Sequence, residues 1–251
     1  RYLLKAGLAL TSELLLTYGE RDEQLFDWFA DPPAVRPTLS WLNESGVMIP
    51  LAPKNTGLAE NYEREMEGGY DQWIEDREIW RSYGLINYGD WYGESGYSWG
   101  NNEYDPAFAH YCEFLRGGDP RWFRIAGEAA RHLGDVDTIN FSTDALQVGG
   151  QYMHIAGHAG GYLPPYFRSK MRGSITIPSH TWVEGMAFHY LLTGDENQRE
   201  SLDRTAQWLL RSGLSDFAGG IDYYDFSNCR ECGWHLTHLT ALARMSESPR
   251  S

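Results

Sequence analysis

The chain has 251 residues, of which 42% are apolar and 14% aromatic, and its formal net charge is −14. This length and composition suit one folded domain with a substantial core, whereas the negative charge argues against nucleic-acid and anionic-membrane partners. No run approaches the roughly 18 apolar residues of a membrane span, and three cysteines do not make a disulfide framework.

Both ends of the chain show helical periodicity. Apolar side chains recur at helical spacing from Tyr2 to Leu16 and from Gly233 to Met245, which predicts a helix in each range. Because Arg1 already lies inside the first pattern and the second stops early, we expect the chain to be a piece of a longer protein. No leader is visible, which carries little weight for a piece.

An aromatic loop is predicted from Tyr88 to Asp105, where glycines interrupt any helix until Pro106. Rings of this kind stack on sugar faces, and amides bond sugar hydroxyls or a carboxylate. The alternative is a loop that packs its rings onto neighbouring helices. Its candidate side chains are Trp91, Tyr92, Glu94, Tyr97, Trp99, Asn101, Asn102 and Tyr104.

Two helical hairpins follow in the pattern of apolar residues. One joins residues 107–115 to 120–133, and the other joins 182–192 to 196–210. Asp119, followed by Pro120, and Asp195 are the predicted N-caps of the second helices. The two Gly-Asp turns lie 76 residues apart, and a third copy begins at Gly233. This recurrence predicts a repeat architecture with sites in its long loops.

The segment between the hairpins is poor in acids. From Ala145 to Val183 there is no Asp or Glu, although the chain is acidic. A locally basic segment suits an anionic substrate, and a basic surface loop is the alternative. Tyr152 and the histidines are candidate acid–base groups. The segment's cationic and titratable side chains are His154, His158, Arg168, Lys170, Arg172 and His180.

Metal chemistry is weakly indicated. His154 and His158 are four residues apart, but nearby glycines argue against a helix and no neighbouring carboxylate completes a ligand set. Cys229-x2-Cys232 is followed too closely by His235 and His238 for usual zinc spacing. The alternative for that run is a loop ending at the next helix. We expect no cofactor; a divalent cation would be compatible, but nothing indicates one.

Two further side chains flank the start of the second hairpin. His180 and Glu184 are four residues apart, so they are predicted to face the same way and to hydrogen-bond. His189 lies near the apolar stripe, which predicts a core histidine.

Four segments carry a family resemblance: Tyr88–Glu94, Asn101–Asp105, Asp135–Asn140 and His180–Gly185. Over residues 80–245 the pattern resembles the (α/α) toroid of polysaccharide lyases and related glycosidases, in particular exo-acting rhamnogalacturonan lyases and the bacterial YetA-like proteins. The resemblance implies an all-α (α/α) toroid or barrel of repeated hairpins. It would be partial and would form one domain over residues 1–251 of a larger enzyme. The flanking β-domains of that family are not apparent.

The activity implied is β-elimination on a uronic-acid polysaccharide such as pectin or rhamnogalacturonan. Such an enzyme neutralises the carboxylate, removes the C5 proton and assists the departing O4. The expected partner is an acidic polysaccharide or oligosaccharide, met in the extracellular space or periplasm, with the cytoplasm left open. The candidate catalytic residues are Asn101, Asn102, Tyr152, His154, His158, Arg172 and His180. The candidate substrate-binding residues are Trp91, Tyr92, Glu94, Tyr97, Trp99, Tyr104, Arg168, Lys170 and Glu184.

Two alternatives stay open. A toroid glycoside hydrolase would need two carboxylates, which Glu94, Glu103, Asp105 and Glu184 could supply. A non-catalytic carbohydrate-binding fragment is the other.

Overall fold

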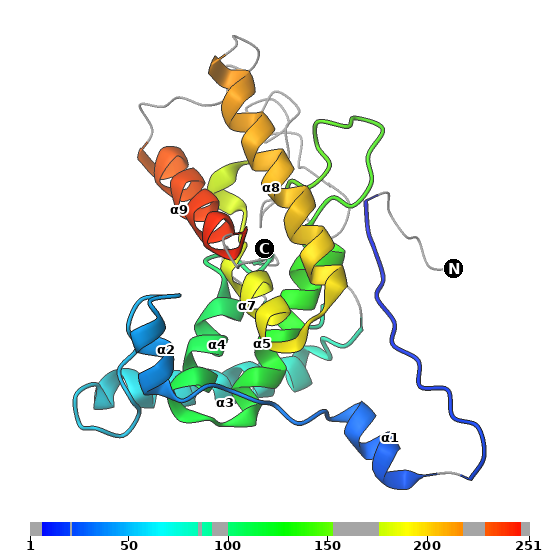
Figure 1. The fold of residues 1–251 in the computed structure, drawn as a ribbon, viewed down its shortest axis with the longest axis vertical. Helices are drawn as coiled ribbons and strands as arrows, with labels where there is room; N and C mark the ends of the chain where they lie inside the picture. The colour runs from blue at the N-terminus through cyan, green and yellow to red at the C-terminus, as the bar shows by residue number, and fades with distance from the viewer. Residues whose placement is uncertain are drawn as a thin grey trace.

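The computed structural model describes residues 7–20, 22–84, 87–91, 100–152, 176–217 and 229–246 (Figure 1). These residues form eight α-helices and two isolated β-bridges, so the predicted all-α class is confirmed. None of the described helices has the length and apolar character to cross a membrane. The helices are α1 (Glu23–Ala30), α2 (Leu39–Ser45), α3 (Glu60–Trp80), α4 (Pro106–Gly117), α5 (Pro120–His132), α7 (Glu184–Thr193), α8 (Glu196–Phe217) and α9 (Cys229–Ser246).

Both predicted hairpins are confirmed, as α4–α5 and α7–α8. In the first, Gly118 takes a φ of 79° and Asp119 Oδ1 accepts a 2.9 Å bond from the Arg121 amide. In the second, Gly194 takes a φ of 74° and Asp195 Oδ1 accepts a 3.0 Å bond from the Asn197 amide. Each helix therefore begins where a short acidic side chain satisfies its first amides.

The repeat extends beyond the turns into the loops. Gly89 and Gly149 both take φ values above 90°, and both press against the backbone of a helix. A Cβ on Gly89 would lie 2.4 Å from the Glu128 carbonyl oxygen, and one on Gly149 would lie 2.1 Å from the Arg204 carbonyl oxygen. Glu128 and Arg204 are 76 residues apart, the same interval as the turns. A glycine therefore lets a loop approach α5 and α8 in the same way.

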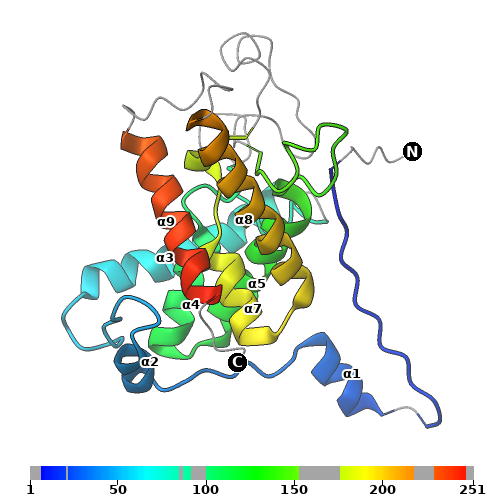
Figure 2. The same ribbon diagram turned by 45° about the horizontal axis from the view of Figure 1, so that its top comes forward.

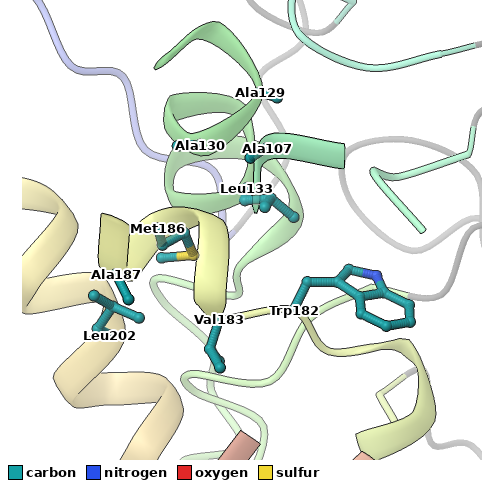
Figure 3. Packing of buried hydrophobic residues seen from close by; sticks show 9 residues of the cluster. All are labelled: Ala107, Ala129, Ala130, Leu133, Trp182, Val183, Met186, Ala187 and Leu202. Atoms are coloured by element: carbon teal, nitrogen blue, oxygen red, sulfur yellow. The ribbon is translucent and has the colours of Figure 1, made fainter. Parts of the chain in front are cut away.

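Small side chains let the helices meet closely at the centre of the bundle. Figure 3 shows Ala107 of α4 grouped with Ala129 and Ala130 of α5. A Cβ on Gly185 would lie 2.4 Å from the Ala107 Cβ, so α4 and α7 also meet closely where both begin. The cluster consists of Ala107, Ala129, Ala130, Leu133, Trp182, Val183, Met186, Ala187 and Leu202, with Trp234 and Leu242 of α9 packed against it.

His189 belongs to the core, as predicted. Its side chain is buried, the Tyr111 hydroxyl lies 2.5 Å from Nδ1, and the Asp195 carboxylate lies 3.3 Å from Nε2. This chain of contacts joins α4 to the turn between α7 and α8.

The N-terminal arm, residues 7–20, corrects a prediction. It contains no helix, so the helix predicted from Tyr2 to Leu16 is wrong over residues 7–16, and residues 2–6 lie outside the described residues. The arm bonds to the bundle instead: the Ala9 amide donates to the Asp135 carbonyl at 2.9 Å, and the Asn140 amide donates to the Gly7 carbonyl at 2.8 Å. In the arm, backbone hydrogen bonds to the bundle thus replace the hydrogen bonds that a helix would make.

The bundle has two different ends (Figures 1 and 2). The Gly-Asp turns lie at one end. At the other, which we name the loop end, α4 and α7 begin, α5 passes through a π-helical turn (Leu133–Asp137), and α9 begins. Contacts confirm this gathering: the Gln151 amide donates to the Trp182 carbonyl at 2.8 Å, and His238 Nε2 of α9 lies 3.2 Å from the Pro178 carbonyl.

Candidate functional site

A strained loop lies at the centre of the loop end. Asn101, Asn102, Tyr104 and Asp105 have φ values of 48°, 52°, 65° and 56°. Each non-glycine residue in this left-handed region costs on the order of 1 kcal/mol, although asparagine and aspartate tolerate it best. Backbone strain of this kind persists only where the surroundings impose it, and it concentrates at binding sites.

A buried ionic network imposes part of that conformation. The Asn102 amide N–H donates to Asp90 Oδ1 at 2.9 Å, and Asn102 Nδ2 lies 3.5 Å from Asp137 Oδ2. His132 Nε2, at the end of α5, lies 3.3 Å from Asp137 and 3.9 Å from Asp90. Burial alone lowers the pKa of His132, but the charges of Asp137 and Asp90 outweigh it and raise the pKa to about 8. An imidazolium between two carboxylates therefore ties the loop to α5.

The two asparagines serve this framework. Both are buried, and Asn101 Nδ2 donates to the Tyr152 carbonyl oxygen at 3.3 Å. Their Nδ2 atoms, on side chains predicted to meet a substrate, thus contact the protein. The structure gives them the position of residues that hold the loop in place.

One carboxylate joins the starts of two helices. Asp105 Oδ1 accepts a 3.1 Å bond from the Phe108 amide of α4, and Oδ2 accepts a 3.0 Å bond from the Gly185 amide of α7. Burial raises the pKa of Asp105 to about 6. Burial and then the neighbouring Asp105 charge raise the pKa of Glu184 to about 7. Glu184 is only half-buried, so it is a carboxyl group that can exchange protons near neutrality.

His180 faces a different carboxylate from the one predicted. It ends a 3-10 turn (Pro178–His180), and residues 181–183 are not helical, so the spacing to Glu184 does not place both on one helical face. His180 Nδ1 instead lies 3.5 Å from Glu103 Oε1. Arg230 Nη2, from the first turn of α9, lies 3.2 Å from the same oxygen. Glu103 thus gathers a guanidinium and an imidazole from distant parts of the chain.

Aromatic rings lie beside these charges. Tyr104 is 61% exposed, and its ring centroid is 5.6 Å from that of buried Trp182 and 6.2 Å from that of half-buried Trp234. Trp182 and Trp234 meet edge to face at 4.9 Å. The exposed face next to Glu103 and Arg230 is therefore aromatic, which suits stacking of a sugar ring.

Trp91 and Tyr152 have packing positions. A Cβ on Gly100 would lie 2.2 Å from the Trp91 ring, so that ring covers the Gly100 backbone. Tyr152 is buried with its hydroxyl close to Gly7, and burial raises its pKa. A raised pKa keeps the phenol protonated at neutral pH, which opposes its predicted use as a base.

The run of cysteines and histidines at residues 229–238 lies within α9. Nine residues of helix separate Cys229 from His238 by about 13 Å along the axis, so the four side chains do not converge on one ion. His238 instead stacks on Trp234, with ring centroids 5.6 Å apart. Among the residues that the structure describes, no three or more His, Cys, Asp or Glu side chains are placed to hold a metal.

Several predicted residues lie outside the described residues, namely Tyr92, Glu94, Tyr97, Trp99, His154, His158, Arg168, Lys170 and Arg172. Five residues of this region were not predicted from the sequence, namely Asp90, His132, Asp137, Arg230 and Trp234. A local signal existed for the loop, since consecutive asparagines favour left-handed backbone. No local signal pairs His132 with Asp137 or Arg230 with Glu103, because these contacts depend on the tertiary fold.

Residues 32–143 match the family model described as PcRGLX-like protein C-terminal alpha/alpha toroid domain. The match includes α2 to α5, the strained loop and the His132 network. The α7–α8 hairpin, which lies beyond it, repeats the α4–α5 architecture. The chain thus has the all-α architecture of an (α/α) toroid domain, and the predicted rhamnogalacturonan lyase-like relationship is supported at that level. No curated protein matches the chain.

Proposed function

We propose that this toroid domain cleaves an acidic polysaccharide of the pectin or rhamnogalacturonan type by β-elimination at the loop end. The observation that carries the proposal is the convergence of Arg230 and His180 on Glu103 beside the exposed ring of Tyr104. β-Elimination needs positive charge on the uronate carboxylate, because the adjacent C5 carbanion is otherwise too costly.

Each group has a proposed task. Tyr104 and Trp234 stack on a sugar ring, while Arg230 exchanges Glu103 for the substrate carboxylate, which a planar guanidinium can bind through two parallel bonds. His180, and Glu184 with its pKa of about 7, are the described groups suited to move a proton near neutrality. His154, His158 and Arg172 remain proposed contributors, and Arg168 and Lys170 remain proposed substrate contacts.

We further propose that the protein meets an acidic polysaccharide or oligosaccharide outside the cytoplasm, and that protein side chains perform the chemistry without a cofactor.

One observation favours a second function, glycoside hydrolysis. A carboxyl group with a pKa of about 7 suits a general acid. Glu184 would take that role, and Glu103 would be its partner, because Asp105 is occupied by two helix N-termini.

Incubation with rhamnogalacturonan and polygalacturonate, with and without EDTA, tests both. Ultraviolet absorbance of an unsaturated uronate indicates elimination, whereas new reducing ends without that absorbance indicate hydrolysis. If both signals are absent but the polysaccharide still binds, the chain is a carbohydrate-binding fragment without this activity. Activity that persists in EDTA would argue against a metal.

Variants sharpen the assignment. We expect Arg230→Ala and His180→Ala each to lower kcat/KM by about tenfold to a hundredfold, since the first removes charge stabilisation and the second removes a proton-transfer group. Arg172→Ala and His154→Ala are expected to lower turnover with unchanged helical circular dichroism. Arg199→Ala, at a half-buried arginine of α8 paired with Glu196 near the turn end, is the matched control. Equal activity in the Arg230→Ala and Arg199→Ala variants would contradict the assignment of Arg230 to the active site.

A further inference from the structure

Two cysteines occupy the first turn of α9. Cys229 is exposed and Cys232 is half-buried, and the structure has both side chains as thiols. Cys112, the third cysteine, lies in α4, where burial raises the pKa of its thiol to about 12. Reactivity depends on the thiolate and on access, so α9 presents the more reactive pair and Cys112 is an internal control.

Helix geometry places this pair within reach of a disulfide. At 1.5 Å rise and 100° per residue on a 2.3 Å radius, Cα atoms three residues apart are about 5 Å apart. Disulfides span roughly 4.4–6.8 Å between Cα atoms. The Cβ atoms of such a pair are about 5–6 Å apart, wider than the roughly 3.8 Å of a bonded pair. The turn must therefore tighten.

The first turn of a helix can tighten at low cost, because its amides have no intrahelical acceptors to lose. A bond made this way keeps some strain, and strained exposed disulfides are the more easily reduced ones. The geometry therefore favours a reversible bond over a permanent cross-link.

We propose that Cys229 and Cys232 form a reversible intramolecular disulfide by exchange with a low-molecular-weight disulfide such as oxidised glutathione. The Cys229 thiolate attacks one sulfur of the oxidant, forming a mixed disulfide and releasing one glutathione thiolate. The Cys232 thiolate then attacks Cys229 Sγ and releases the second. The protein loses two protons and two electrons, and oxidised glutathione becomes two molecules of glutathione.

The bond would act on the candidate site without depending on its proposed activity. Arg230 lies between the two cysteines and holds Glu103 at 3.2 Å. Trp234, half-buried beside Tyr104, lies in the next turn. Tightening the first turn changes the backbone that presents Arg230, so oxidation is expected to shift the fluorescence of Trp234.

Trypsin offers a direct test, because it cleaves after Arg230 and separates the two cysteines into peptides 212–230 and 231–244. The intact protein is equilibrated with oxidised glutathione, denatured in an excess of alkylating agent so that the buried Cys112 thiol also reacts, and digested without reduction. Before alkylation we expect an intact monomer mass lower by two hydrogens. After digestion we expect the two peptides to remain joined and Cys112 to be alkylated in peptide 82–116. Reduction should separate the peptides.

Three results would overturn the proposal: both thiols alkylated in full after oxidation, a bond to Cys112, or a covalent dimer on a non-reducing gel. Cys229→Ser and Cys232→Ser are the matched variants. Each should instead hold one glutathione on the remaining cysteine, which shows that the exchange chemistry works while the intramolecular bond is absent.

Discussion

At the scale of the residue, His132 determines how the strained loop is held. Its ring is buried with Asp90 and Asp137, so three ionisable groups share a buried site. Burying such charges is costly unless each has partners, and the gain lies in fixing one arrangement. Here the arrangement fixed is the path of residues 101–105.

The charge of His132 predicts a pH dependence of stability. Its folded-state pKa of about 8 exceeds the unfolded value of 6.5, so its contribution is complete below pH 6.5 and is lost as pH rises through 8. We expect the free energy of unfolding to fall by roughly 2 kcal/mol or less from this group between pH 6.5 and 9. Urea unfolding across that range measures it.

Asp137→Asn is the matched variant. It removes the carboxylate charge that raises the pKa of His132 most, and it leaves an acceptor for Asn102. Its stability should fall less steeply over the same pH range. An unchanged slope would place the origin of the pH dependence elsewhere.

At the scale of the element, the hairpins depend on glycines of two kinds. Gly194 ends α7 with a φ of 74°, and no atom lies within 4 Å of where its Cβ would be. Gly149 has a similar φ of 92°, but it also presses on the Arg204 carbonyl of α8. The first glycine is needed for conformation alone, and the second for conformation and close approach.

These two positions give a matched pair of substitutions. Gly194→Ala is expected to cost about 1 kcal/mol for the left-handed backbone. Gly149→Ala is expected to cost several times more, roughly 3 kcal/mol, because the backbone of α8 must also move. Chemical denaturation of both variants compares them. Equal losses would contradict the close approach, and Gly89→Ala should behave like Gly149→Ala because the repeat relates them.

At the scale of the whole molecule, the arm and the bundle differ in how they are held. The arm meets α5 through the half-exposed ion pair of Glu13 with Arg131, and the end of α1 meets α5 through that of Asp31 with Arg124. Exposed pairs contribute little and weaken with salt. By contrast, α3 meets α4 through buried Glu113, whose carboxylate contacts Lys54, Arg116 and Tyr62.

This difference predicts where proteolysis begins. Leu14 is 83% exposed, Leu16 75% and Tyr18 94%, and they belong to the non-helical arm. Chymotrypsin at low enzyme ratio should cut at these residues before any site in α4 or α5, and faster in high salt. Mass spectrometry of the first fragments identifies the cut, and first cleavage within α4 or α5 would contradict it.

Features that depend on neighbours along the chain could be predicted from the sequence alone. Asp119 and Asp195 cap helices within two residues of themselves, and glycine follows each preceding helix, so both hairpins and their repeat were predictable. α3 escaped prediction because Gly68 and Gly69 lie in its middle and its surface is largely polar. The exposed ring of Tyr104 was also predictable, because the loop combines aromatic residues with Asn101 and Asn102.

The tertiary structure alone decided which charges meet. Arg230 contacts Glu103, which is 127 residues away in the sequence. The Thr11 amide of the arm donates to the carboxylate of Asp135, 124 residues away, and the arm makes no helix. The predicted pairing of His180 with Glu184 was wrong because the intervening residues 181–183 are not helical. Local propensity carries no term for such contacts: they form when distant segments are brought together, and their energies then exceed the small preferences that sequence periodicity records.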